Sequence, residues 1–153
     1  MNSGKIIILF TNKLTLSDRQ PDYLRMISAI TNGIKVSVLA EFQPFYSQPE
    51  RNLYAFSYTI HIENTTENTV KLLSRHWKIF DSYGTSYEVN GDGVVGLSPV
   101  IEPGEFFEYT SGCNFASTIG RMHGKYIMQR VRDGRLFEIN IPQFILEVPY
   151  IRN

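Results

Sequence analysis

Residues 54–63 read YAFSYTIHIE, and this stretch decides the fold because large apolar side chains recur at every second position. The apolar positions run from Tyr54 to Ile62, and Ser57, Thr59 and His61 lie between them. Successive side chains of a β-strand point to opposite faces, so strict alternation predicts a strand with one buried face.

The same period of two recurs along the chain. Residues 34–42 alternate in this way, and further strand candidates are residues 70–80, 86–89, 106–111, 121–131, 136–141 and 144–149. Turn-forming residues separate the runs; Asp133-Gly134 between two of them is a strong hairpin signal. The only modest helical candidate is residues 22–30. Seven or eight short strands predict an all-β fold, an antiparallel sandwich or barrel.

The composition fits one globular domain of 153 residues, of which 42% are hydrophobic. Lys and Arg number 15, as do Asp and Glu, so no overall field draws the protein to nucleic acid or to a membrane surface. The single cysteine, Cys113, excludes an intramolecular disulfide. We find no stretch long enough for a membrane span and no signal peptide, and we therefore expect a cytoplasmic protein.

The first 25 residues differ from the rest. They are more basic, and residues 15–22 are polar without a sustained period. Met26 then begins a segment that could itself be a protein start. We expect residues 1–25 to be an N-terminal extension, flexible or produced by a mis-assigned start, with a short strand at 5–10, and residues 26–153 to form the domain.

Residues 91–96, Gly-Asp-Gly-Val-Val-Gly, match the pattern G-x-G-x-x-G. In a dinucleotide-binding fold such glycines connect a strand to a helix whose first amides hold a pyrophosphate. Here Pro99 follows and no helical period begins, so that interpretation fails. The simpler interpretation is a loop with positive-φ glycines. The alternative is a nest of amides that binds an anion.

Ser74-Arg75-His76-Trp77 is the second stretch of interest. The sole tryptophan, Trp77, is better explained as a core residue than as a platform for a ligand. Arg75 and His76 must point to opposite faces of a strand. Arg75 either binds loop carbonyls or a carboxylate, or it supplies positive charge to a binding site.

The sequence predicts no metal site and no catalytic residue. The three histidines, His61, His76 and His123, have no ligand spacing, and one cysteine cannot build a structural zinc site. Ser111-Gly112-Cys113 lacks the nucleophile elbow of hydrolases. Cys113 has no activating base nearby in the sequence and is better explained as a buried, inert residue. We expect no cofactor.

Several motifs in register resemble the ApaG family. They begin with Leu72–Ile79 and continue through the glycine motif; the others are Ser98–Phe106, Tyr109–Gly112, Gly120–Met128 and Phe137–Phe144. The resemblance covers about residues 30–149. One departure is residues 114–119, where the family has a small-polar stretch containing proline.

The resemblance implies an immunoglobulin or fibronectin type III-like sandwich without established enzymatic activity. It also implies a link with cobalt and magnesium tolerance or efflux in bacteria, and protein–protein contact in eukaryotic fusions. We therefore expect a non-enzymatic binding module with an unidentified protein partner, and a homodimer is compatible with its edge strands. The alternative is a nucleotide or pyrophosphate binder. In both cases the predicted site comprises Gly91, Asp92, Gly93, Gly96 and Arg75, with residues 114–120 and Tyr109 as further contacts of the binding module.

Overall fold

The computed structural model describes residues 26–149, which form nine strands and two short 3-10 turns. The turns are Pro44–Tyr46 and Pro49–Arg51, between the second and third strands. The strands are β1 Ile27–Thr31, β2 Ile34–Phe42, β3 Tyr54–Asn64, β4 Val70–Asp81, β5 Thr85–Asp92, β6 Val100–Ile101, β7 Phe106–Phe115, β8 Ile119–Arg130 and β9 Leu136–Glu147.

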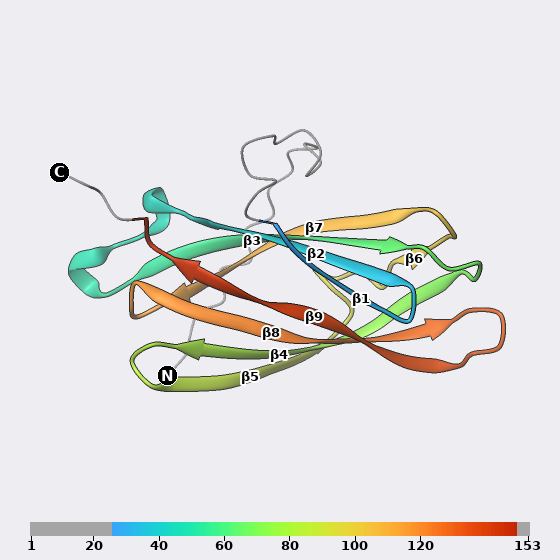
Figure 1. Cartoon of the computed structure of the whole chain (residues 1–153). Coiled ribbons are helices and arrows are strands. Elements are labelled where there is room, and N and C mark those ends of the chain that lie inside the picture. The colour runs from blue at the N-terminus through green and yellow to red at the C-terminus, as the bar shows by residue number, and fades with distance from the viewer. Residues whose placement is uncertain (1–25, 150–153) are drawn as a thin grey trace.

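The strands form two antiparallel sheets that pack face to face (Figure 1). One sheet has the order β1-β2-β3-β7 and the other β5-β4-β8-β9, with the short β6 paired to the start of β4. The predicted antiparallel sandwich is therefore confirmed.

The core lies between the sheets and follows from the period of two. Along β3, Phe56, Tyr58, Ile60 and Ile62 point inward and are buried. Tyr58 meets Trp77 from the opposite sheet, with ring centroids 5.5 Å apart, and Phe144 completes the cluster at 5.8 Å from Tyr58. Tilted and edge-on rings of this kind add to the stabilisation from burial.

A β-bulge in β4 decides which side chains of this strand face the core. The pairing of β4 with β8 shifts between Leu72 and Ser74, so that Arg75 pairs with Tyr126 and Trp77 with Gly124. Without the extra residue, alternation from the buried Leu72 would have turned Arg75 and Trp77 outward. The bulge therefore turns an arginine toward the core.

The two long sides of the sandwich differ. On one side β1 and β9 approach each other, and the backbone N–H of Asn140 donates to Thr31 Oγ1 at 3.2 Å. Asn32 Nδ2 donates to the carbonyl oxygen of Glu138 at 3.3 Å on the same side. On the other side the edge strands are β5 and β7. We call this second side the open seam.

The strands predicted within residues 26–149 are present, but three expectations need correction. The helical candidate at residues 22–30 is wrong over its second half, because Ile27–Thr31 is strand β1; residues 22–25 lie outside the described part. The two strands predicted at 136–141 and 144–149 are one strand, β9, which passes through Pro142. Gly91 and Asp92, expected in a loop, are the last residues of β5. The predicted extension at 1–25 and its strand at 5–10 lie outside the described residues.

No helix in residues 26–149 is long and apolar enough to cross a lipid bilayer.

Asn64 closes one end of the sandwich. Its side chain is fully buried, and Nδ2 donates to the carbonyl oxygens of Asn68 at 2.8 Å and Ile101 at 2.9 Å. Its Oδ1 accepts from the backbone and hydroxyl of Thr66. One side chain therefore ties the β3–β4 turn to β6.

We predict that Asn64→Ala lowers the free energy of unfolding by roughly 2–4 kcal/mol, because four hydrogen bonds of a fully buried side chain are lost. Urea unfolding measures this. Asn90→Ala, at an exposed position on β5, is the control and should change stability by less than about 0.5 kcal/mol. Equal effects of the two substitutions would contradict this role of Asn64.

Candidate functional site

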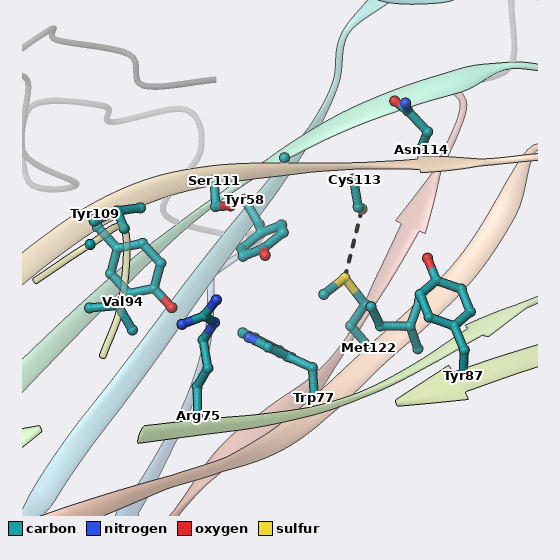
Figure 2. Close-up of a pocket in the computed structure, with 14 residues that line it drawn as sticks. Tyr58, Arg75, Trp77, Tyr87, Val94, Tyr109, Ser111, Cys113, Asn114 and Met122 are labelled. Atoms are coloured by element: carbon teal, nitrogen blue, oxygen red, sulfur yellow. Dashed lines mark hydrogen bonds between the residues drawn. The ribbon is translucent and has the colours of Figure 1, made fainter. Parts of the chain in front are cut away.

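A pocket of about 100 Å³ lies between the two sheets at the open seam. Figure 2 shows Arg75 and Trp77 entering it from one sheet and Tyr58, Tyr109, Ser111 and Cys113 from the other. The lining is completed by Ile79, Tyr87, Val94, Val95, Gly96, Gly112, Asn114 and Met122. Most of these groups are aromatic or aliphatic, and Arg75 is the one that carries full charge.

The guanidinium of Arg75 is held by the backbone of the glycine motif. Its Nη1 donates to the carbonyl oxygens of Asp92 and Gly93, both at 2.8 Å. This is the first of the two interpretations considered for Arg75, in which it binds loop carbonyls. Among residues 26–149 no carboxylate forms an ion pair with Arg75, so within this part of the chain only carbonyl oxygens compensate its charge beside the pocket.

Two glycines of the motif permit a close approach of other groups. A Cβ on Gly91 would lie 2.8–2.9 Å from three atoms of the Arg75 guanidinium, so only glycine lets the guanidinium lie flat against β5. At Gly93, with φ +57°, a Cβ would lie 2.1 Å from the carbonyl oxygen of Leu97. At both positions, therefore, the absence of a side chain leaves room for a neighbouring group to pack against the backbone.

The rest of the motif is a tight turn that is fastened at its base. Gly93 donates to the carbonyl oxygen of the bulge residue Leu73, and Val94 and Leu97 bond to each other in both directions, all at 2.8–2.9 Å. The central residues, Val95 and Gly96, have φ of +45° and +77°. A β-branched residue at positive φ is strained by roughly 1–3 kcal/mol, and such strain tends to concentrate at binding sites.

The tyrosines of the pocket are neutral hydrogen-bonding groups. Burial raises the pKa of Tyr58 to about 12 and raises the pKa of Tyr109 well above its usual value. The hydroxyls of Tyr109 and Tyr126 are hydrogen-bonded to each other inside the core. These residues therefore do not supply negative charge that would balance Arg75 at neutral pH.

The β7–β8 connection at the far end of the pocket is anchored by a buried carboxylate. Asp81 accepts from the backbone N–H of Ala116 at 2.7 Å and from the hydroxyl of Ser117. Ser82 Oγ donates to Ser117 Oγ at 2.8 Å. The predicted contact loop at 114–120 is thus short and fixed, since 114–115 belong to β7 and 119–120 to β8.

The structure brings part of the predicted site together. Arg75 and Gly96 line the pocket, Gly93 supports the turn beside it, and Gly91 and Asp92 lie behind the guanidinium. His76 points outward, where its Nε2 lies 3.3 Å from Glu88 Oε2. Sequence reasoning missed Tyr58 and Ser111, which meet because they pair across β3 and β7.

Trp77 and Cys113 are buried, as predicted. The thiol of Cys113 lies 3.8 Å from the sulfur of Met122, and burial raises its pKa to about 12. In the described part of the chain, no three His, Cys, Asp or Glu side chains gather where they could hold a metal ion.

Comparisons with known proteins identify relatives. A family model described as the ApaG domain matches residues 44–130. A protein named Protein ApaG from Brucella anthropi is 48% identical over 128 residues, covering 81% of this chain and 95% of the relative. Another Protein ApaG, from Methylobacterium sp., is 46% identical and covers 83% of this chain and 97% of the relative.

A solved structure agrees with these matches. The crystal structure of a protein from Bordetella pertussis, described as the putative ApaA protein, superposes with a TM-score of 0.74 at 42% identity. The match covers 77% of this chain and 95% of that one.

We predict that Cys113 reacts with Ellman's reagent at pH 8 at least about 1,000-fold more slowly in the folded protein than in 8 M urea. The reason is that its raised pKa keeps the thiol protonated and the core excludes the reagent. Because the chain has one cysteine, the absorbance reports this residue alone. Reaction at the rate of a free thiol in the folded protein would contradict the inert assignment.

Proposed function

The chain belongs to the ApaG domain family, and we propose that it is a non-enzymatic binding module whose recognition surface is the open seam. The observation that carries the proposal is the convergence of three features at one place. A cation without a carboxylate partner in residues 26–149, a strained turn and the edge strand β7 all border the same pocket. A rigid sandwich that presents loops and edges is a common arrangement for recognition.

The partner we propose is a protein in the cytoplasm. Edge strands can pair with an extended segment of another chain, which gains backbone hydrogen bonds and places alternate side chains in pockets. A link with cobalt and magnesium tolerance or efflux would then be exerted through this partner.

Pyrophosphate or nucleotide binding is less well supported as the alternative. The amides of Gly93, Val94 and Leu97 are already used in backbone hydrogen bonds, which leaves few donors for a nest. The pocket between the sheets, about 100 Å³, is also small beside the roughly 300–1,000 Å³ of pockets that enclose a larger ligand, so a nucleotide would not fit inside it.

Two glycines provide a matched test of the open seam. Gly96 and Gly84 both have positive φ, and a Cβ at either would have nothing within 4 Å. Gly96 lies at the pocket, whereas Gly84 lies in the β4–β5 turn at one end of the sandwich. A photo-crosslinking phenylalanine analogue at each position therefore carries a similar backbone strain and differs in location.

We predict that irradiation in cells yields a discrete protein adduct at position 96 and not at position 84, measured by gel shift and mass spectrometry. Urea unfolding of both variants provides the control for folding. Adducts of equal yield at both positions, or none at position 96, would contradict the proposed recognition surface.

A further inference from the structure

We propose that the pocket at the open seam takes a carboxylate on a short apolar stem, presented as a glutamate side chain by the partner. This inference rests on the proposed function and names the chemical group that the site recognises. It follows from the unused edge of Arg75, from the size and lining of the pocket, and from the adjoining strand β7.

The guanidinium of Arg75 has N–H groups that donate no hydrogen bond to residues 26–149. Both of its hydrogen bonds to residues 26–149 leave from Nη1. The edge formed by Nε–H and Nη2–H therefore stays available, and two parallel N–H groups match the two oxygens of a carboxylate. The bonds to Asp92 and Gly93 and the flat contact with Gly91 hold the guanidinium in one orientation.

The environment strengthens such a contact. The ring of Trp77 and the side chains of Ile79, Val94 and Met122 border the pocket, and these four residues are almost fully buried. An ion pair in such surroundings is screened by water much less than one on the surface. A cation there without a carboxylate partner in residues 26–149 favours an anion over a neutral ligand.

The size and lining select the kind of anion. About 100 Å³ admits one small functional group with a short stem. The rings and aliphatic groups around it suit methylene groups better than a second charged group. A glutamate side chain meets both conditions, and a pyrophosphate, with charge at both ends, does not.

The edge strand explains how a partner would deliver this group. Ser111, Gly112, Cys113 and Asn114 of β7 border the pocket, and β7 pairs with β3 to form one edge of its sheet. An extended segment added beside β7 would direct every second side chain toward the interior. One of those side chains would reach Arg75.

Trp77 provides the measurement, because it is the only tryptophan in the chain and it lines the pocket. Its fluorescence is followed during titration with butyrate, with the neutral isostere butyramide, and with inorganic pyrophosphate at constant ionic strength. We expect saturable binding of butyrate with a Kd of roughly 1–10 mM and no saturable change with butyramide or pyrophosphate. N-acetylglutamate α-amide and N-acetylvaline then distinguish a side-chain carboxylate from a chain terminus, and the former should bind more tightly.

Two variants assign the binding to this pocket. Arg75→Met should weaken butyrate at least about tenfold, as expected for loss of a charged hydrogen-bond pair. Ser111→Leu places a larger side chain in the pocket and should also weaken butyrate binding at least about tenfold. This second variant keeps the test valid if Arg75→Met does not fold. Lys78→Met, on the exposed face of β4, should leave the Kd unchanged.

Three results would overturn the inference: absence of saturable butyrate binding, tighter binding of pyrophosphate, or a butyrate Kd in both pocket variants equal to that of the unsubstituted protein. If butyrate does not bind but position 96 gives a discrete adduct, the proposed recognition surface is supported and only the inference of a carboxylate ligand is rejected. Butyrate binding without an adduct would instead support the carboxylate site and contradict the protein partner.

Discussion

The hydrogen bonds from Arg75 to the carbonyl oxygens of Asp92 and Gly93 connect every feature of the open seam. They require the guanidinium to lie against Gly91, which in turn requires glycine at that position. They also fix the end of β5 from which the turn at Val95 and Gly96 projects. The bulge in β4 makes this possible, since it places Arg75 on the inner face and lets Leu73 accept from Gly93.

This arrangement explains why glycine occupies each of the three positions of the motif without invoking a bound phosphate. Gly91 leaves room for the guanidinium, Gly93 approaches the carbonyl oxygen of Leu97, and Gly96 occupies a positive-φ position of the turn. The pattern G-x-G-x-x-G therefore locates the proposed binding site in the chain, but the phosphate ligand that this pattern usually indicates differs from the carboxylate that we propose. Positive charge at the site comes from one side chain, and the surrounding groups are mainly apolar.

Much of the fold could be predicted from alternation, because β2 and β3 each bury most of one face. Strand β1 could not be predicted although Asn32-Gly33 is a hairpin signal, since none of its five residues is buried. Pro142 did not end β9 because this strand lies at a sheet edge, where a missing N–H is tolerated. Arg75 and the glycine motif were found, but the pocket was not, because it depends on a one-residue bulge and on the pairing of β3 with β7.

The central claim is that Arg75 and Gly91 act as one unit that holds the seam, and a double-mutant cycle of Arg75→Met and Gly91→Ala tests it most directly. Each substitution displaces the guanidinium, so the second should add little to the loss of unfolding free energy caused by the first. We predict a coupling energy of about 1 kcal/mol or more from urea unfolding. Losses that add to within about 0.3–0.5 kcal/mol would contradict the account.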